Sequence, residues 1–474
     1  MAADPLGGLH QLAGRGGSHD RHRHGPALVV DHDRRQRGRG ARMRKPACGL
    51  IAEAVAVSAP AQRYDGRPRL LSNQARSITE HAKAVGALPT SVVPQLIDMI
   101  TASGLRGRGG GWFPSGRKIA SVAGRANPYV VVNGMESEPA AGKDKLLLRL
   151  APHLVLDGAE LAALALDADR VTVAVHRDTG LARHMMNAIA DRVAAGWGKV
   201  EIDVSEPPNW YVSSESTAVA SFVGGGEAKP KADSARVSGV NGRPTLVSNV
   251  ETFAHIALIG RYGPNWFRQA GTGDSPGTAL FTVSGAVRSP GVYELPVGIT
   301  GETILRVANG VREPISALLV GGYGGAWIPP TQLHRPFSPE GLEPLGASLG
   351  AGIVVALPAR TCGLFETVRV ATWMAEQSAK QCGPCFRGLP AIAEDFALIA
   401  REGSRKAYER LRFRLGVING RGACAHPDGV VKFVDSALKT FALDIRRHLS
   451  GQLCPGGPRV LPIPELPNES EGWQ

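Results

Sequence analysis

A loop rich in glycine places the strongest restriction on how this chain can fold. Residues 104–118 read GLRGRGGGWFPSGRK, with five glycines within the first eight positions. Arg106, Arg108, Arg117 and Lys118 add positive charge around them. Glycine tolerates positive φ and lets the backbone come close to a ligand, and clustered N–H groups attract anions. The loop therefore predicts a binding site for a phosphate-bearing ligand.

Two familiar glycine motifs do not fit this loop. A Walker loop needs lysine and then serine or threonine directly after its last glycine, but Arg117 follows Gly116. A dinucleotide fingerprint that began at Gly107 would need glycine or alanine in place of Trp112. It would also follow a strand, whereas residues 92–105 have helical spacing of apolar residues. Composition alone is equally consistent with a plain flexible loop.

An apolar, β-branched segment, 129–132, predicts a strand soon after the loop. Asn133, Glu136 and Glu138 follow its C-terminal end, where open α/β sheets bind ligands. Taken singly, the two glutamates are more simply explained as solvated loop residues. Helical and strand patterns then alternate, which predicts an α/β fold with a largely parallel sheet covered by helices. They comprise a helix over 146–166 and strands over 170–176 and 200–204.

A second module is expected over residues 279–330. Its segments FTVSGAV and VYELPVG predict two strands joined by a Pro-Gly turn. A short helix over 302–307 and a strand over 315–322 complete the pattern of a β-grasp domain. We expect this domain to pack against its neighbours and to take no part in catalysis.

The C-terminal part predicts a helical bundle, because apolar residues over 362–449 recur at steps of three and four. Cys382 and Cys385 form a CxxC pair in a glycine-proline break between the first two helices, and Cys424 lies in a later break. In a cytoplasmic protein this spacing indicates metal or redox chemistry.

Length and composition fit a multidomain globular protein without a membrane span. A chain of 474 residues is long enough for two to four domains. It holds no apolar run of about eighteen residues, and its start lacks a secretory pattern. Six cysteines are too few for a disulfide scaffold. We therefore expect a cytoplasmic protein with no direct membrane insertion, at most peripheral to a membrane redox complex.

The net charge of +12 does not indicate a nucleic-acid partner. Residues 1–47 hold ten Lys and Arg against four Asp, so about half of the excess lies there. That part has no apolar periodicity, which predicts a disordered basic segment over 1–62 or an over-extended start of translation. Binding of nucleic acid would rest on this charge alone, and a solvated tail is the simpler interpretation.

Five motifs occur in one order along the chain. The glycine loop is followed by VVVNGMESEPAAGKDK, GRPTLVSNVET, SGAVRSPGVYELPVG and then CGPC with a later cysteine. This series resembles the NADH-binding flavoprotein subunit of respiratory complex I and its relatives in hydrogenases and formate dehydrogenases, over roughly residues 65–450. The resemblance implies an FMN/dinucleotide-binding α/β domain over 63–276, a soluble-ligand-binding β-grasp domain over 277–332, a linker over 333–361, an iron-sulfur helical bundle over 362–450 and a tail over 451–474.

The resemblance also implies functional residues. Glycine N–H groups and Lys118 would meet a phosphate, Asn133 and Asn249 would bind ribityl or phosphate oxygens, and Glu138 would orient a carboxamide. Lys118 and Glu138 are the expected catalytic residues. The expected cofactor-binding residues are Gly107, Arg108, Gly109, Gly110, Gly111, Phe113, Gly116, Lys118, Asn133, Glu136, Glu138, Glu215, Lys231 and Asn249.

Several positions depart from the family pattern. Ser121 and Ser234 stand where relatives place phenylalanines that sandwich the dinucleotide, and such an aromatic stack contributes on the order of 1 kcal/mol. FMN binding is therefore expected, whereas NADH binding is expected to be weak. Met135 replaces an acid near the flavin, and serines replace site residues of relatives at 214, 216 and 248.

Relatives hold a [4Fe-4S] cluster through CxxCxxC and one distant cysteine. Cys382, Cys385 and Cys424 match the last three of these, but Ala379 stands at the first. Four-cysteine ligation is the norm for such clusters. Three outcomes remain open: a cluster completed by solvent, His426, Asp428, Cys362 or Cys454; a zinc ion held by Cys382, Cys385, Cys424 and His426; or no metal.

These features together predict an oxidoreductase subunit that depends on flavin and iron-sulfur. Electrons would pass from a reduced donor such as NAD(P)H through FMN to the cluster, and then to a small thioredoxin-like or ferredoxin-like iron-sulfur protein. The alternative is a degenerate subunit that serves only in docking or assembly. The flavin hypothesis requires that the glycine corner is not filled by a side chain of the protein itself, such as that of Trp112.

Overall fold

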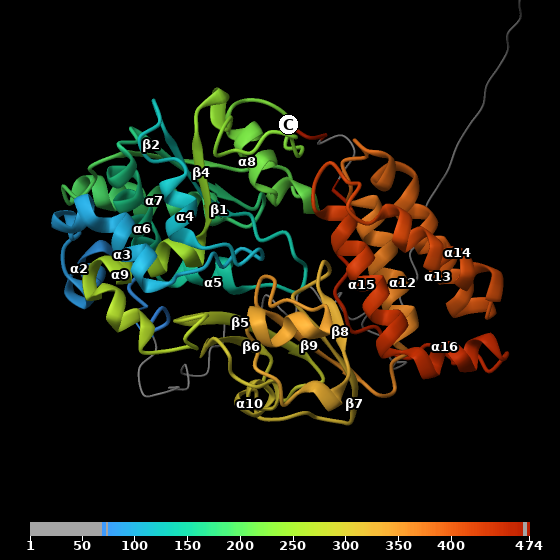
Figure 1. Ribbon diagram of the computed structural model, residues 1–474. Coiled ribbons are helices and arrows are strands. Elements are labelled where there is room, and N and C mark those ends of the chain that lie inside the picture. The colour runs from blue at the N-terminus through green and yellow to red at the C-terminus, as the bar shows by residue number, and fades with distance from the viewer. Residues whose placement is uncertain (1–68, 73, 468–471) are drawn as a thin grey trace, which may run out of the picture. The chain divides into compact units, whose positions relative to one another are not determined.

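The computed structural model describes residues 69–72, 74–467 and 472–474 of the chain (Figure 1). The basic segment 1–62, expected to be disordered, lies outside the described residues, as does the beginning of the domain expected over 63–276. The first helices of the described part are α2 (Ile78–Val85), η1 (Thr90–Gln95), α3 (Leu96–Ser103) and α4 (Ser115–Ala120).

A parallel sheet forms the centre of the first domain. Its strands, in the order β3-β2-β1-β4, are all parallel, so their carboxyl ends meet at one edge. In the register between β1 and β4, Asn133 pairs with Asn249. The three strands predicted from the sequence are confirmed, with small differences at their ends. The strands are β1 (Tyr129–Gly134), β2 (Arg170–Val175), β3 (Glu201–Ser205) and β4 (Thr245–Asn249).

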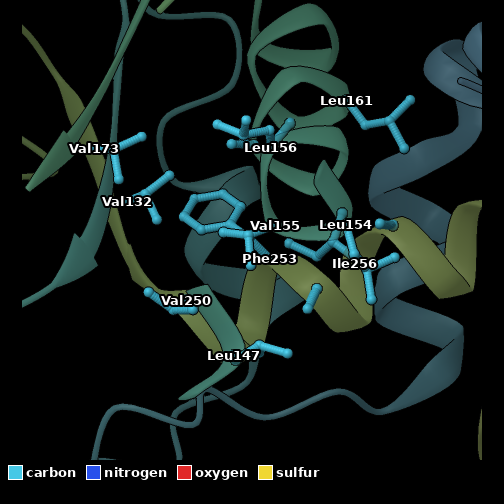
Figure 2. Packing of buried hydrophobic residues seen from close by; sticks show 14 of the residues in the cluster. Val132, Leu147, Leu154, Val155, Leu156, Leu161, Val173, Val250, Phe253 and Ile256 are labelled. Carbon is cyan, nitrogen blue, oxygen red and sulfur yellow. The ribbon is translucent and has the colours of Figure 1, made fainter. Parts of the chain in front are cut away.

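Helices cover this sheet and bury its apolar residues. Figure 2 shows the ring of Phe253, on α9, pointing toward Val132 of β1. Gly158 of α6 lies so close to α9 that a Cβ there would stand 1.8 Å from the carbonyl oxygen of Phe253. The helices of this domain include α5 (Lys143–Leu150), α6 (Pro152–Leu166), α7 (Leu181–Ala194), α8 (Ser216–Val223) and α9 (Val250–Arg268).

A second, mixed sheet forms the β-grasp domain, and it corrects one boundary. Residues 353–358 were expected to belong to a linker over 333–361, but they form β9, which lies between β5 and β7. The segment IVVALP is buried throughout, so it shows no alternation that would reveal a strand. The other elements are β5 (Thr278–Gly285), β6 (Gly291–Pro296), α10 (Gly301–Val307), β7 (Ile315–Val320), β8 (Ala326–Ile328) and β9 (Ile353–Pro358).

The C-terminal region is helical, as predicted. The last two helices are separated at Phe441, where the backbone leaves helical φ and ψ. The CxxC pair lies between α12 and α13, where residues 384–388 form one π-helical turn. The helices are α12 (Gly363–Glu376), α13 (Leu389–Glu402), α14 (Arg405–Ile418), α15 (His426–Thr440) and α16 (Ala442–Leu449).

The close approach of α6 and α9 gives a prediction about stability. Gly158→Ala is expected to lower the free energy of unfolding by at least about 1–3 kcal/mol, because the new methyl group would collide with backbone that cannot move independently. Gly416→Ala, in α14, meets no atom within 4 Å and is expected to raise stability by about 0.5–1 kcal/mol. Urea unfolding of both variants measures the contrast; equal effects would contradict it.

Candidate functional site

A cavity of about 1190 Å³ lies where the carboxyl ends of β1 and β4 face the β-grasp domain and the helical bundle. It is lined by backbone and side chains from all three parts of the chain. Twelve of the predicted site residues line it: Gly107, Gly109, Gly110, Gly111, Phe113, Lys118, Asn133, Glu136, Glu138, Glu215, Asn249 and Cys424.

The glycine loop is fixed at its ends and presents backbone to this cavity. The N–H of Gly107 donates to the carbonyl of Phe113 (2.9 Å), and the N–H of Arg108 donates to Thr252 Oγ1 (2.9 Å). Gly110 has a φ of +116°, which side chains rarely adopt, and a Cβ on Gly109 would stand 3.1 Å from Asn249 Cβ. Only glycine therefore lets this backbone follow the cavity wall so closely.

Trp112 does not fill the corner beneath the loop. Its indole Nε1 donates to the carbonyl of Gly350 (2.8 Å), and its ring lies 4.3 Å from the guanidinium of Arg108. The side chain is nearly buried between the loop and the β-grasp domain. The flavin hypothesis requires that Trp112 leave this corner open, and it does.

Lys118, on α4, brings a cation to the cavity. Burial lowers the pKa of its ammonium group to about 8, and nearby Arg236 adds to the effect, while Glu215 opposes it. Among the described residues, Glu215 is too weak an anionic partner to offset this burial. An anionic ligand in the cavity would supply a stronger one.

Three of the predicted cofactor-binding residues do not line the cavity. Arg108 is buried, and its guanidinium donates to the carbonyl of Thr278 (3.0 Å). Gly116 faces α3, where a Cβ would stand 2.2 Å from Thr101 Oγ1. Lys231 is exposed outside the cavity.

Three polar side chains at the cavity cap helices. Glu136 accepts the N–H groups of Asp144 (2.8 Å) and Lys145 (3.0 Å) at the start of α5. Glu215 caps α8, and Asn249 caps α9 by accepting the N–H of Glu251 (3.0 Å). Negative or acceptor groups at helix N-termini are stabilising. These side chains therefore order the cavity wall through bonds within the protein.

Glu138 joins the three domains. Its carboxylate accepts the hydroxyl of Tyr211 (2.6 Å) and the N–H of Tyr323 (3.0 Å), which follows β7. Burial raises its pKa, although these hydrogen bonds and Lys432 of α15 act in the opposite direction. Gly322 makes room, because a Cβ there would stand 2.6 Å from the carboxylate. Glu138, which is the predicted catalytic residue, therefore also maintains the contact between the domains.

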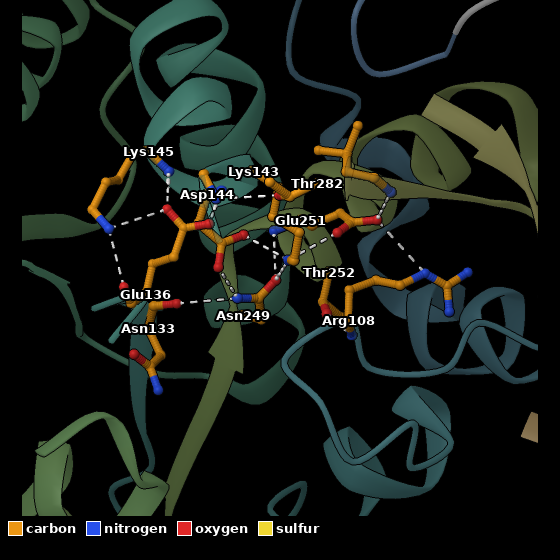
Figure 3. A network of polar contacts seen from close by, with 12 residues as sticks. Arg108, Asn133, Glu136, Lys143, Asp144, Lys145, Asn249, Glu251, Thr252 and Thr282 are labelled. Carbon is orange, nitrogen blue, oxygen red and sulfur yellow. Dashed lines mark hydrogen bonds and ion pairs between the residues drawn. The ribbon is translucent and has the colours of Figure 1, made fainter. Parts of the chain in front are cut away.

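A buried ionic network lies behind the carboxyl ends of the strands (Figure 3). Lys143 Nζ contacts Asp144 Oδ1 (2.8 Å), Glu251 Oε2 (2.9 Å) and Asn249 Oδ1 (3.1 Å). Burial would raise the pKa of Glu251, but Lys143 and other cationic neighbours bring it down to about 2. The second oxygen of Glu251 accepts the N–H of Leu280 on β5 (2.9 Å), so the network links the two sheets.

The cysteines of the bundle form one group beside the cavity. Cys385 hydrogen-bonds Cys382 and interacts with Cys424. Burial is the main cause that raises the pKa of Cys385, and these two cysteines raise it further. Burial also raises the pKa of Cys424. Cys362 cannot join them, because α12 separates it from Cys382 and a helix of 14 residues is about 21 Å long. Cys454 lies with Cys362, so neither can complete a cluster here.

These three thiols do not form a group of ligand atoms close enough together for a single zinc ion. Thiolates on one tetrahedral zinc lie about 3.8 Å apart, given Zn–S bonds near 2.3 Å. Among the described residues, the one group of three potential ligand atoms within 4.8 Å of one another is elsewhere, at Cys362, His448 and Cys454. A cluster holds each thiolate on a different iron and so spaces its ligands more widely.

His426 offers a further donor beside these cysteines. Its Nε2 lies 2.9 Å from the carbonyl of Met374, so that nitrogen carries the proton. Within the described part of the chain, its buried Nδ1 has no hydrogen-bond partner. Burial lowers its pKa to about 4, which keeps the ring neutral. Asp428, the other expected candidate, instead accepts the N–H of Gly420 (2.7 Å).

Sequence reasoning missed several lining residues. Tyr211 binds Glu138, and Lys432 is the cation nearest that carboxylate on α15. Neither stands in one of the glycine or cysteine motifs, and only the packing of the bundle against the first domain brings Lys432 to the cavity. The other missed residues include Ser137, Asp144, Ser348, Arg412 and Asn419.

Comparisons with known proteins agree with this geometry. The family model described as the Nuo51 FMN-binding domain matches residues 100–258, and the NADH-ubiquinone oxidoreductase-F iron-sulfur binding region matches residues 366–448. These two regions contain the glycine loop and the three cysteines. The fold and the paired sites therefore define a flavoprotein with an iron-sulfur region.

Among characterised relatives, the F subunit of NADH-quinone oxidoreductase in Mycobacterium tuberculosis is 33% identical over 387 residues, which cover 77% of this chain and 86% of that protein. The second F subunit of this enzyme in Rhizobium meliloti is 30% identical, with coverage of 76% and 90%. The NAD+-reducing [NiFe]-hydrogenase in its air-oxidized state has a similar chain, with a TM-score of 0.73, 29% identity and coverage of 85% and 70%.

The chain belongs to the family of NADH-quinone oxidoreductase F subunits. The predicted cofactors, FMN and a 4Fe-4S cluster, and the predicted NADH dehydrogenase-like oxidoreductase activity are confirmed by the matches. The relatives are subunits, which implies that this chain also has partner subunits. In the described residues no single helix could cross a bilayer, although the bent pair 78–85 and 90–103 passes on length and composition.

The buried network predicts a pH-dependent loss of stability in one variant. Lys143→Met would leave Glu251 and Asp144 buried without their cation and is expected to lower the free energy of unfolding by about 3–5 kcal/mol at pH 7. Without the cation, the pKa of each carboxyl group is higher in the folded than in the unfolded protein, so folding is favoured only when the group is protonated. The loss of stability should therefore become smaller toward pH 4.

Urea unfolding at pH 4, 5.5 and 7 measures this effect. The matched control is Lys145→Met, which removes a partly exposed lysine 3.5 Å from Glu136 and is expected to cost about 1 kcal/mol or less. A Lys143→Met deficit that stays constant with pH would contradict the explanation.

Proposed function

We propose that the chain passes electrons from a reduced nicotinamide dinucleotide to a partner iron-sulfur protein, with FMN bound at the glycine loop and a cluster at Cys382, Cys385 and Cys424. One observation carries this proposal. Gly109, Gly110 and Gly111 line the same cavity as Cys424, so a cofactor held at the loop would share one chamber with the iron-sulfur region.

The residues present suit the phosphate end of FMN. Glycines that line the cavity do so with backbone atoms alone, and Lys118 lies beside them without a strong anionic partner. The carboxylate of Glu136 and the amide of Asn249 are occupied by helix N-termini. Their proposed role is therefore to fix the cavity wall, whereas Lys118 and the loop contact the phosphate.

When bound, FMN supplies the conversion of an electron pair into single electrons. The protein's own contribution is position and exclusion of water. Glu138 holds the β-grasp turn at Tyr323 and the phenol of Tyr211 together over the cavity. Such a fixed wall keeps the distance between the flavin position and Cys424 constant, which is what efficient transfer requires.

The cavity offers space for a second ligand. Its volume of about 1190 Å³ exceeds the roughly 300–1,000 Å³ of a typical ligand pocket. Phe113 is 42% exposed at this wall, and the guanidinium carbons of Arg117 and Arg236 each lie 5.6 Å from its ring. A ring flanked by two cations suits a planar, phosphate-bearing donor, which supports NAD(P)H. The serines at 121 and 234 remain the reason to expect weak NADH affinity.

The bundle supplies three thiolates, and His426 Nδ1 is our candidate for the fourth ligand position left by Ala379. The partner proposed is a small thioredoxin-like or ferredoxin-like iron-sulfur protein, which would accept electrons from the cluster at the bundle surface. We propose a cytoplasmic location, at most peripheral to a membrane complex. The docking-only alternative is not favoured, because the cavity keeps the loop, Lys118 and the cysteines.

Anaerobic cofactor analysis of the full chain tests the proposal. We expect one flavin per chain, iron and sulfide in equal amounts, and an iron-sulfur EPR signal on reduction. Cys424→Ser should lose the cluster signal and keep the flavin, whereas Cys454→Ser should keep both. A preparation that lacks flavin and iron after reconstitution would refute the proposal and support the docking role.

Lys118 gives a second prediction. Lys118→Met is expected to weaken FMN binding about 10- to 100-fold at pH 7, the effect of one charge-assisted hydrogen bond. Since the free ammonium has a pKa of about 8, wild-type affinity should fall about tenfold per pH unit above that value, because binding must take up a proton.

Flavin fluorescence titration at pH 7, 8, 9 and 10 measures both effects. Lys118→Arg is the control, because its guanidinium stays charged over this range and should flatten the pH dependence. If Lys118→Met kept the wild-type slope, another group would be responsible for it.

A further inference from the structure

A second group of potential metal ligands lies away from the cavity. Ligand atoms of Cys362, His448 and Cys454 all lie within 4.8 Å of one another. They come from the residue before α12, the last turn of α16 and the segment after α16. The iron-sulfur region that matches the family model spans residues 366–448, so it includes neither of these cysteines.

A hydrogen bond at Nδ1 orients the imidazole ring of His448 so that Nε2 can bind a ligand. Nδ1 of His448 lies 2.9 Å from the carbonyl of Ala400, so it carries the proton. Nε2 then holds a lone pair that accepts the N–H of Cys454 (3.3 Å), and a bound metal would take the place of this hydrogen bond. Fixing one ring nitrogen on a carbonyl is how metal-binding histidines are usually oriented. The buried ring cannot swing to solvent.

The two sulfurs are equally constrained. Cys362 occupies the N-cap position of the 14-residue α12. Its N–H donates to the carbonyl of Gly456 (2.6 Å). This bond holds the segment that contains Cys454 against the start of α12.

We propose that Cys362, His448 and Cys454 bind a zinc ion that fastens the C-terminal segment to the bundle. Zinc takes thiolates near 2.3 Å and imidazole near 2.0–2.1 Å, so tetrahedral ligand atoms lie about 3.4–3.8 Å apart. Atoms already within 4.8 Å need to move by about 1 Å or less to reach this geometry. Both thiols release their protons on binding, and a water completes the tetrahedron.

The ion would act at the start of a long connection. Beyond Cys454 the chain runs beside α12, where Glu366 accepts the N–H groups of Val460 (3.1 Å) and Leu461 (2.7 Å). Thr361 Oγ1 donates to the carbonyl of Pro458 (3.1 Å). Arg459, between these contacts, is exposed. A metal bound at Cys454 would hold the beginning of this segment in place and so limit its opening.

Zinc content and cobalt spectra test the site directly. The full chain, purified under reducing conditions, is titrated with Zn²⁺ against a chromophoric chelator, and with Co²⁺ to record thiolate-to-metal absorbance. Wild type is expected to bind one more equivalent than Cys454→Ser or Cys362→Ser. The matched control, Cys424→Ser, alters the other cysteine group and should retain that equivalent.

Trypsin cleavage after Arg459 gives an independent readout. If cleavage requires the segment to open, free zinc at 100 times the dissociation constant should slow it about 100-fold in wild type. Zinc should leave the rate unchanged in Cys454→Ser. This cysteine lies outside every helix, so its replacement is not expected to prevent folding.

Two results would overturn the proposal. One is equal zinc binding by wild type and the Cys454→Ser and Cys362→Ser variants. The other is an intact mass showing that Cys362 and Cys454 are joined as a disulfide in the reduced preparation. Both are separable from the redox function, since flavin and iron content should be the same in all of these variants except Cys424→Ser.

Discussion

The contact of Lys143 with Asp144, Glu251 and Asn249 is the interaction on which the rest of the site depends. A buried ammonium group is costly unless carboxylates neutralise it, and the carboxylates that neutralise Lys143 come from the starts of α5 and α9. Glu251 also binds β5 and lies 3.8 Å from Arg108. The network thus fixes the cavity floor, the glycine loop and the β-grasp sheet in one arrangement.

Most polar side chains at the cavity bind other parts of the protein, although their position alone would suggest that they bind a ligand. Glu136, Glu215 and Asn249 satisfy helix N-termini, and Glu138 holds three domains together. The backbone of the glycine loop and the side chain of Lys118 are then the groups available to bind a phosphate. A preorganised wall of this kind loses little entropy when a cofactor binds, which is why caps and ion pairs gather around such sites.

The bundle carries two cysteine groups with different geometry. Cys382, Cys385 and Cys424 lie near the cavity, while Cys362 and Cys454 lie close to His448 at the other end of α12. The helix between them keeps the groups apart. Among the described residues, the replacement of the first family cysteine by Ala379 is therefore not compensated by another cysteine, and His426 is the neighbour with an unused donor atom.

The sequence by itself determined the parallel sheet, the bundle and the cofactor region, because strand and helix periodicity and the glycine loop are local signals. Tertiary structure decided the rest. Only strand pairing shows that residues 353–358 complete the β-grasp sheet, since a fully buried strand has no alternation. Likewise, Arg108 turns from the cavity to Thr278, and Cys362 meets Cys454, because partners far apart in sequence set where a side chain points.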